Sequence, residues 1–264
     1  MKYQNLIVER SGHIAVVSFN RPTKRNALSL DLLHEIDAVA NEFSTDGQTR
    51  VVIFTGKGKD FSVGSDLSDP KNAEQIQDTM LLKRRHLKIG PRMLRSIYEM
   101  DQITIAAING YALGGGACIA SACDFRIGAE SCLIGYPEVK MAMNLSWAAL
   151  PLCVHLVGPA RAKRMVILAN KEKAETLQKW GFLDDVVPEN QLLAKTLEIA
   201  EAYAAQPPIA AQMVKRSVNT ISSALDQAIM HMDSDQFLYA TSGEDFQEAI
   251  RAFFEKRTGV YKGN

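Results

Sequence analysis

The chain carries no excess of charge of either sign. Of its 264 residues, 30 are Lys or Arg and 30 are Asp or Glu, so the formal net charge at pH 7 is zero. No overall electrostatic field therefore draws the protein to nucleic acid or to an anionic membrane. Local basic groups, such as that from Lys83 to Arg85, are more often solvated faces than binding sites. We expect neither nucleic acid nor a membrane as a partner.

Cysteines are few, and long apolar runs are missing. The four cysteines lie in apolar surroundings without the two-residue spacing of a zinc or redox motif: Cys118, Cys123, Cys132 and Cys153. This usage favours reduced thiols packed in a core, with neither a disulfide framework nor a metal site. No apolar run of about 18 residues occurs, and the N-terminus lacks the apolar segment of a signal peptide. We therefore expect a soluble, cytoplasmic protein.

No low-complexity linker interrupts the chain, and its pattern changes once. Before Met141, strands, loops and helices alternate. A hairpin is expected around Ser11-Gly12, and a helix capped by Ser29 is expected to end near Phe43. This alternation is typical of a mixed α/β layer fold.

Beyond Met141 the pattern predicts helix almost throughout. One helix is expected to begin at Trp147 and another to run from Ala224 to Tyr239. These helices have more apolar surface than they could cover alone, so we expect them to pack on the α/β part and on other subunits. Residues 70–100 are predicted to be helical but irregular, with a break near Gly90-Pro91.

The rest of the chain is organised around residues 103–120. A short apolar run, Ile103 to Ile108, predicts a buried strand that leads into a glycine turn and then a helix. Gly114, Gly115 and Gly116 remove three side chains, so bare N–H groups at the helix start could hold an anion or an oxygen that becomes one. The glycines could equally just permit a tight corner. A dinucleotide site is less favoured, because Ile119 stands where that motif needs glycine.

Six short motifs follow one another in a fixed order along the chain. They are Asn20-Arg-Pro-x-x-x-Asn-Ala-Leu28, Thr55-Gly-x-x-Lys-x-Phe-Ser-x-Gly-x-Asp-Leu67, Ala107-x-Asn-Gly-Tyr-Ala-Leu-Gly-Gly-Gly116, Gly135-x-Pro-Glu138, Gly181-x-x-x-x-Val-Val-Pro188 and Phe253-x-Glu-Lys-Arg257. In this order and over essentially the whole length, the chain resembles the crotonase family, the enoyl-CoA hydratase and isomerase superfamily.

The resemblance implies a fold, an assembly and a substrate class. It implies a spiral of strand-strand-helix units over residues 1–200 and a helical trimerisation region over residues 201–264. Proteins of this kind assemble as homotrimers or as hexamers of two stacked trimers. They act on acyl-coenzyme A thioesters, so coenzyme A is part of the substrate, and neither a separate cofactor nor a metal is implied.

The resemblance also suggests which residues react. Two backbone N–H groups polarise the thioester carbonyl in such proteins, and here they map to Ser65 and Gly115. Negative charge develops on the thioester oxygen, so preorganised donors aimed at it stabilise the enolate. Glu138, which is expected to close the strand after the central helix, would be the acid–base residue, since desolvation raises a carboxyl pKa towards neutrality. From the residues alone it could instead stabilise a helix N-terminus.

The chain departs from the hydratase pattern at Cys118. Hydratases of the family carry a second glutamate there, and a buried neutral thiol cannot hold water as a charged acceptor. Nothing near Cys118 in the sequence favours a nucleophilic thiolate either. Relatives that shift a double bond keep only the later glutamate, which removes a proton at C2 and delivers it to C4. Ser146 stands where some dienoyl isomerases have aspartate, which argues against that activity.

Further residues are candidates for the walls of the site. Trp147 suits a dry acyl pocket, although it could equally pack the start of a helix. The other pocket candidates are Cys118, Tyr136 and Ser146. For coenzyme A, motif position suggests Lys24, Arg25, Lys59 and Val63, and suggests that Phe253 and Lys256 reach the adenine end of a site on a neighbouring subunit.

Three functions follow from these observations. The favoured one is an enoyl-CoA isomerase that converts 3-enoyl-CoA to 2-enoyl-CoA with Glu138 as sole acid–base residue. The first alternative is a hydratase or hydratase-lyase in which another group replaces the missing glutamate. The second is an acyl-CoA-binding protein without catalytic activity.

Overall fold

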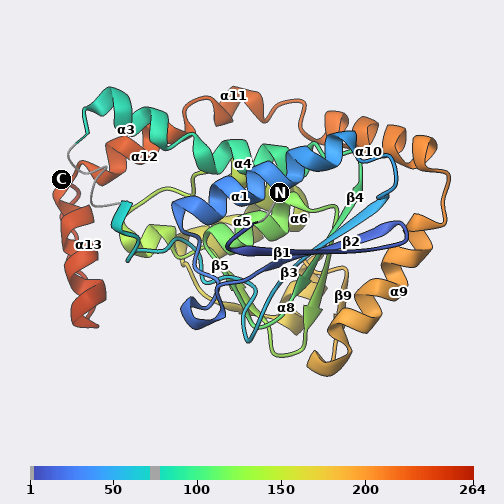
Figure 1. The fold of residues 1–264 in the computed structure, drawn as a ribbon. Helices are drawn as coiled ribbons and strands as arrows, with labels where there is room; N and C mark the ends of the chain where they lie inside the picture. The colour runs from blue at the N-terminus through green and yellow to red at the C-terminus, as the bar shows by residue number, and fades with distance from the viewer. Residues whose placement is uncertain (1–2, 72–77) are drawn as a thin grey trace.

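The computed structural model describes residues 3–71 and 78–264, which are arranged around two sheets (Figure 1). Within these residues the larger sheet has the strand order β1-β2-β3-β4-β6-β9, and the smaller has the order β5-β7-β8. The strands are β1 (Leu6–Ser11), β2 (Ile14–Phe19), β3 (Val51–Gly56), β4 (Ile103–Ile108), β5 (Tyr111–Leu113), β6 (Phe125–Ala129), β7 (Leu133–Gly135), β8 (Glu172–Lys173) and β9 (Asp185–Val187). The mixed α/β class predicted from the sequence is confirmed.

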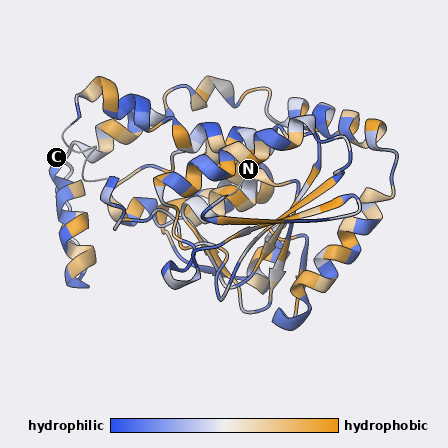
Figure 2. Cartoon of the chain, viewed as in Figure 1, coloured by the Kyte–Doolittle hydropathy of each residue, from blue (hydrophilic) through white to orange (hydrophobic). Residues whose placement is uncertain are grey.

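The N-terminal elements follow the predicted pattern closely. β1 and β2 form the expected antiparallel hairpin, and β2 then pairs in parallel with β3. Ser29 caps α1 (Leu30–Glu42), because its Oγ accepts a hydrogen bond from the Leu32 N–H at 3.3 Å. α1 turns its apolar side inward, and the strands beneath it appear in Figure 2 as hydrophobic segments between helices of mixed polarity.

Helices cover the larger sheet on both sides. α1 and α4 (Ile89–Tyr98) pack against each other above it, and α9 (Leu192–Ala204) packs against β3 and β4 from the other side (Figure 1). Burial on both faces explains why β3 and β4 read as continuous apolar runs rather than as alternating patterns.

The sequence predicted that the central strand runs directly into the glycine turn, and the structure differs. β4 ends at Ile108, and the chain crosses to the smaller sheet, where Tyr111–Leu113 forms β5 before α5 (Gly115–Ala122) begins. Gly110 makes this crossing possible: its φ is +62°, and a Cβ there would lie 2.2 Å from the Lys59 carbonyl oxygen. α5 therefore starts at the junction of the two sheets.

The irregular region before β4 contains α3 (Met80–His86) and α4. The part of that prediction covering residues 72–77 lies outside the described residues. The predicted break near Gly90-Pro91 is confirmed: α3 ends at His86 and α4 begins at Ile89, so both residues lie in the first turn of the second helix. A proline is tolerated there, since the first-turn N–H groups have no acceptor within the helix.

The C-terminal part is helical, as predicted, with two corrections. The helices are α6 (Ala149–Val157), α7 (Pro159–Ile167), α8 (Ala174–Trp180), α9, α10 (Pro208–Ser222), α11 (Gln227–Met230), α12 (Asp233–Thr241) and α13 (Glu244–Glu255). The single helix expected from Ala224 to Tyr239 is two helices, α11 and α12, and Asp233 and Asp235 lie in the first turn of the second, where acidic residues are favoured. The helix expected from Trp147 begins at Ala149, because Trp147 and Ala148 both have positive φ.

The short 3₁₀ helices complete the chain: η1 (Pro22–Lys24), η2 (Phe43–Thr45), η3 (Glu138–Met141) and η4 (Glu189–Gln191). The predicted boundary after residue 200 falls within α9.

The C-terminal helices leave apolar side chains uncovered. On α10 these include Ile209, Met213, Val214, Val218 and Ile221. These apolar side chains are exposed in the single chain. The trimer or hexamer implied by the family resemblance stays a prediction, and this face of α10 is where contacts between subunits can be tested.

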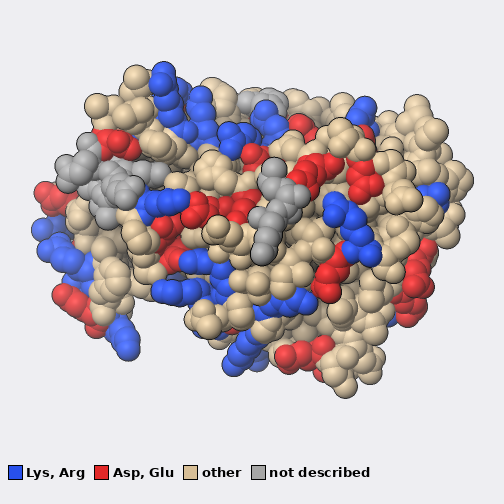
Figure 3. Space-filling model, viewed as in Figure 1, with Lys and Arg blue, Asp and Glu red and all other residues tan. Residues whose placement is uncertain are grey.

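The described part of the chain contains no helix with the length and apolar character needed to cross a membrane. On the face shown in Figure 3 acidic and basic side chains are interspersed, with Lys and Arg gathered over α3 and α4. All four cysteines are buried and free, as the sequence predicted.

Candidate active site

Glu138 lies against the start of α5. β7 ends at Gly135, so Glu138 does not close that strand as predicted but opens η3 three residues later. Gly114 has φ +52°, and a Cβ built on it would lie 2.9 Å from Glu138 Oε1. The carboxyl group therefore rests on bare main chain at the helix start, and a side chain at position 114 would displace it.

The Glu138 carboxyl is poorly solvated. The residue as a whole is partly exposed, but Oε2 is buried and has no hydrogen-bond partner among the described residues. Burial raises the pKa of Glu138 from 4.5 to about 7. A carboxyl group with a pKa near neutrality can both accept and return a proton under ordinary conditions.

The two predicted oxyanion donors lie on adjacent bends of the main chain. Gly64 has φ +91°, and its ideal Cβ would be 2.8 Å from the Leu113 carbonyl oxygen and 3.6 Å from the Gly115 nitrogen. The bend that precedes Ser65 and the bend that precedes α5 are therefore in contact. Substituting Gly64 would separate them.

The hydrogen bonds around these bends leave both amides available. Leu28 pairs with Ser65 as a parallel bridge, in which the Leu28 N–H donates to Gly64 O and the Asp66 N–H donates to Leu28 O. In such a bridge the N–H of Ser65 itself points away from Leu28. Gly115 is the first residue of α5 and has no acceptor within the helix. Neither amide donates to another described residue.

Trp147 covers the next residue of the same helix start. A Cβ on Gly115 would lie 2.5 Å from Trp147 Cζ3 and 2.7 Å from Leu28 Cδ1. A Cβ on Gly90, in α4, would lie 2.3 Å from Trp147 Nε1. The indole thus spans from α4 to the predicted oxyanion residue, beside the carboxyl of Glu138.

Cys118 is buried one turn further along α5. Burial, and secondarily the nearby Glu138 carboxyl, raise the pKa of the Cys118 thiol well above its ordinary value. The thiol is therefore neutral and cannot replace a carboxylate or act as a thiolate nucleophile.

The other two pocket candidates differ in position. Tyr136 is fully buried, and its hydroxyl lies 2.6 Å from Ser121 Oγ on α5, so it packs behind the helix. Ser146 is partly buried in the segment just before Trp147, and its carbonyl accepts from the Ala149 N–H at 3.4 Å. Ser146 precedes Trp147, which covers Gly115, and Tyr136 precedes Pro137, whose Cδ would lie 3.8 Å from a Cβ on Gly114.

Asn26 organises the loop that carries the first motif, a role that sequence reasoning missed. Its amide is buried: Nδ2 donates to Lys57 O at 3.0 Å and to Asp60 O at 2.7 Å, and Oδ1 accepts from the Arg21 N–H at 2.9 Å. The fixed asparagine of the first motif was the available signal. Its three hydrogen bonds fix the two loops relative to each other.

Arg25 is held by protein groups at the predicted coenzyme A end. It makes a bidentate ion pair with Asp60, with Nε–Oδ2 at 2.7 Å and Nη2–Oδ1 at 3.1 Å, and its guanidinium lies 4.6 Å from the Tyr111 ring centroid. Burial alone would raise the pKa of Asp60, but hydrogen bonds from Arg25 and the Tyr111 N–H lower it below its ordinary value. Lys171, which sequence reasoning missed, places Nζ 4.9 Å from the same ring.

The remaining coenzyme A candidates are at the surface. Lys24 donates to Ser68 Oγ at 3.4 Å, Lys59 is exposed and Val63 is partly buried. Phe253 and Lys256 are exposed near the end of α13, which extends from the edge of the molecule in Figure 1. The structure therefore gathers Lys24, Arg25, Lys59 and Val63 around the first loops, whereas Phe253 and Lys256 belong to α13, which packs against η3.

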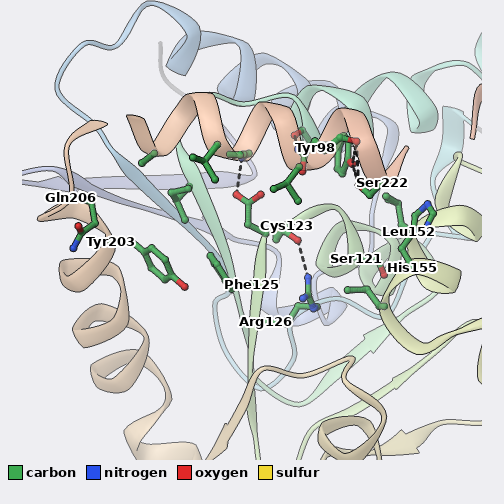
Figure 4. A pocket seen from close by; sticks show the side chains of 18 of the residues that line it. Tyr98, Ser121, Cys123, Phe125, Arg126, Leu152, His155, Tyr203, Gln206 and Ser222 are labelled. Atoms are coloured by element: carbon green, nitrogen blue, oxygen red, sulfur yellow. Dashed lines mark hydrogen bonds and ion pairs between the residues drawn. The ribbon is translucent and has the colours of Figure 1, made fainter. Parts of the chain in front are cut away.

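A large cavity of about 620 Å³ lies elsewhere, between α10 and the edge formed by α6, α9 and β6 (Figure 4). None of the predicted site residues lines it. Its charged groups are used internally, since Lys215 Nζ lies 2.7 Å from Asp124 Oδ2. The cavity therefore offers no acid–base group comparable to Glu138.

Comparison with known proteins gives one consistent result. The family model described as enoyl-CoA hydratase/isomerase matches residues 9–264. The chain is 33% identical over 258 residues to a short-chain-enoyl-CoA hydratase of Clostridium acetobutylicum, covering 97% of both, and 32% identical over 259 residues to a crotonyl-CoA hydratase of Syntrophomonas wolfei, also covering 97% of both. The solved structure of an enoyl-CoA hydratase from Bacillus anthracis matches with a TM-score of 0.76 at 33% identity, over 99% of this chain and 100% of that one. The chain belongs to the enoyl-CoA hydratase/isomerase family, the crotonase superfamily.

Proposed function

We propose that this protein converts 3-enoyl-CoA thioesters to 2-enoyl-CoA thioesters, with Glu138 as the sole acid–base residue. The observation that carries this proposal is the poorly solvated Glu138 carboxyl, with its pKa raised to about 7, resting on Gly114 beside the available amide of Gly115. Proton removal at C2 and return at C4 require one group that can alternate between acid and base. The reaction requires no bound water and no metal.

The amides of Ser65 and Gly115 hold the thioester oxygen in this proposal. Removing the C2 proton places negative charge on that oxygen, and two N–H groups on touching bends are preorganised to receive it. Each donor of this type is worth roughly 3 kcal/mol of transition-state stabilisation. The α5 N-terminus adds a favourable dipole at the same point.

The negative charge of the dienolate is shared by the thioester oxygen, C2 and C4, so the proton can return at C4. Glu138 delivers it from the same face, and the product is the conjugated 2-enoyl thioester. Burial supports the proton transfers because a carboxyl pKa of about 7 makes the Glu138 carboxylate a stronger base for the C2 proton, while the protonated acid can still return that proton at C4.

Hydration of a 2-enoyl-CoA is the second candidate, and the named relatives favour it. The short-chain and crotonyl-CoA hydratases are the proteins to which this chain is similar. Here Glu138 alone would activate water, because the Cys118 thiol is neutral. Asp233 is the other acid near Cys118, and its carboxylate already accepts from the Ala148 N–H at 2.9 Å.

The substrate's coenzyme A part would lie along the first loops. Lys24, Lys59 and Lys171 would face the phosphates, and Arg25, fixed by Asp60, would present the outer edge of its guanidinium. Val63 would contact the pantetheine chain. No separate cofactor enters this scheme.

The α13 residues contribute only if subunits assemble. α13 packs against η3 of the same chain, but Phe253 and Lys256 are exposed, so they would serve a neighbouring subunit's coenzyme A in a homotrimer or hexamer. The exposed apolar row on α10 supports such an assembly.

The test uses two substrates and one substitution. A 3-enoyl-CoA and crotonyl-CoA are each incubated with the protein in isotopically labelled water, and the products are separated. We expect double-bond migration with label exchanged at C2, and Glu138→Gln should abolish it while the affinity for a coenzyme A thioester changes by no more than a few fold. Glu130→Gln, at an exposed carboxylate between β6 and β7, is the matched control.

Each other outcome identifies a different function. Turnover of the 3-enoyl substrate by Glu138→Gln would contradict the proposal. Incorporation of labelled oxygen from water into crotonyl-CoA, without migration, would establish the hydratase. Tight thioester binding with no exchange at C2 would indicate a non-catalytic binder.

A further inference from the structure

Trp147 has a backbone conformation that a tryptophan rarely adopts. Its φ is 66° and that of the next residue, Ala148, is 60°. Two successive non-glycine residues in the left-handed region persist only where the surrounding structure holds them. This strained segment lies directly beside the proposed site, and it sets the position of the Trp147 side chain there.

Asp233, in the first turn of α12, holds this segment. Its Oδ2 accepts a hydrogen bond from the Ala148 N–H at 2.9 Å, and the amide of Trp147 also faces the carboxylate. Asn144 Nδ2 donates to the Asp233 carbonyl oxygen at 3.3 Å. Asp233 is buried, so these bonds form with little competition from water.

α12 is itself attached to the body of the protein. Arg84, near the end of α3, makes a bidentate ion pair with Asp235, two residues after Asp233 on the same helix. That pair is exposed and does not touch the Trp147 segment. It therefore provides a matched control for the effect of a charge on α12.

The left-handed segment directs the indole across the start of α5. The ring lies over Gly115 and reaches Gly90 on α4, so close that a Cβ on either glycine would fall within 2.5 Å of a ring atom. Both glycines are needed for the ring to fit between the two helices.

An acyl chain bound in the proposed manner would meet this ring. In that binding mode the thioester oxygen would lie at the amide of Gly115, and C2 would face the Glu138 carboxyl, which rests on Gly114. Carbons beyond C4 must continue past the same two residues, and the indole occupies the space between α4 and α5. A rigid aromatic ring set in place by packing is displaced less easily than an aliphatic side chain.

We propose that Trp147 closes the acyl end of the site and restricts the protein to short acyl chains, and that Asp233 is the positioning residue that holds Trp147 there. The inference rests on the proposed function for the identity of the ligand as an acyl-CoA. It does not depend on whether that ligand is isomerised or hydrated.

The first experiment measures binding without turnover. The affinities of butyryl-CoA, octanoyl-CoA and dodecanoyl-CoA, which have no double bond to move, are determined by calorimetry for the full-length protein. We expect the wild type to favour butyryl-CoA over dodecanoyl-CoA by about tenfold or more, and Trp147→Ala to remove most of that preference by gaining affinity for the longer chain. Trp147→Phe should have the same effect to a lesser degree, which keeps the test open if the alanine variant does not fold.

The second experiment tests Asp233 through Trp147. Asp233→Ala should shift the chain-length preference in the same direction as Trp147→Ala, and the double variant should shift it no further, since both act through one ring. Asp233→Asn, which keeps a carbonyl acceptor, should restore the wild-type preference. Asn144→Ala should give a smaller shift, and Asp235→Asn should give none.

Tryptophan fluorescence reports on the surroundings of Trp147 in the folded protein, so a loss of stability alone would not change the emission wavelength. Trp147 and Trp180 are the two tryptophans of the chain, so Trp180→Phe leaves Trp147 as the sole reporter. Asp233→Ala should move its emission to longer wavelength in the folded protein, and Asp235→Asn should not.

Two results would overturn the inference. Equal affinity of the wild type for all three thioesters would show that Trp147 sets no limit, even if double-bond migration is intact. If folded Asp233→Ala keeps both the wild-type chain-length preference and the wild-type emission, Asp233 does not position Trp147. Failure of migration with the expected preference would contradict the proposed function alone.

Discussion

Replacing Glu138 by glutamine is expected to stabilise the folded protein above neutral pH while removing its acid–base group. The carboxyl pKa is raised from 4.5 to about 7 because the charged form is buried without a partner. Each unit of difference between the folded and unfolded pKa corresponds to about 1.4 kcal/mol, so ionisation of Glu138 in the folded state costs about 3 kcal/mol. Glutamine avoids this cost at every pH.

The sign of the effect follows from which state loses its proton first. Below the unfolded pKa of 4.5 the carboxyl is protonated in both states, so ionisation has no effect on stability. As pH rises the unfolded chain ionises first, which favours unfolding. The loss is complete once the pH exceeds the folded pKa of about 7. The wild type should therefore fall progressively below the glutamine variant between these two values.

Urea unfolding at a series of pH values measures this difference. Wild type and Glu138→Gln should differ little near about pH 4 and by about 3 kcal/mol near about pH 9. Glu130→Gln, at an exposed carboxylate, corrects for changes that a surface substitution would cause. A difference between wild type and Glu138→Gln that does not change with pH would refute the reasoning, because the carboxyl would then have an ordinary pKa.

Four other outcomes are expected. The kcat/KM for double-bond migration should rise with pH through about 7, because Glu138 must be ionised to accept the first proton; a pH–rate profile measures this. Gly64→Ala should lower kcat by about a hundredfold with little change in thioester affinity, because its methyl group would lie 2.8 Å from Leu113 O and displace the donor that follows it; steady-state kinetics and calorimetry separate the two. Asn26→Ala should lower the free energy of unfolding by about 2 to 3 kcal/mol in urea, since it leaves buried partners unpaired. Cys118 should react with a thiol reagent only after unfolding, which timed labelling and mass spectrometry would show.

The sequence was sufficient for features that depend on neighbouring residues. Alternation and capping predicted the hairpin and α1, because a strand period and a serine N-cap are local signals. The glycine triplet predicted a helix start that exposes main-chain amides. Each of these needs only a few consecutive residues.

Features that depend on contacts between residues far apart in the chain could not be predicted from the sequence. The chain enters a second sheet at β5, which was not predicted because three residues carry too little pattern to distinguish a short strand from a turn. The strain at Trp147 was also not predictable, since the bond that holds it comes from Asp233 on another helix. Asn26 likewise gains its importance only from carbonyl groups of a loop about thirty residues away.

The glycine triplet shows how these levels connect. A tight corner alone would explain only the positive φ of Gly114. At each of the three positions, however, a different neighbouring group leaves no room for a Cβ. Beside Gly114 lies the carboxyl of Glu138, beside Gly115 the indole of Trp147, and a Cβ on Gly116 would lie 2.7 Å from the Ser62 carbonyl oxygen. A single methyl group at any of the three positions would therefore move the acid–base residue, the acyl wall or the loop that carries the second donor. The proposed reaction needs those three groups around one thioester at the same time, so it accounts for all three glycines, whereas a tight corner accounts for one.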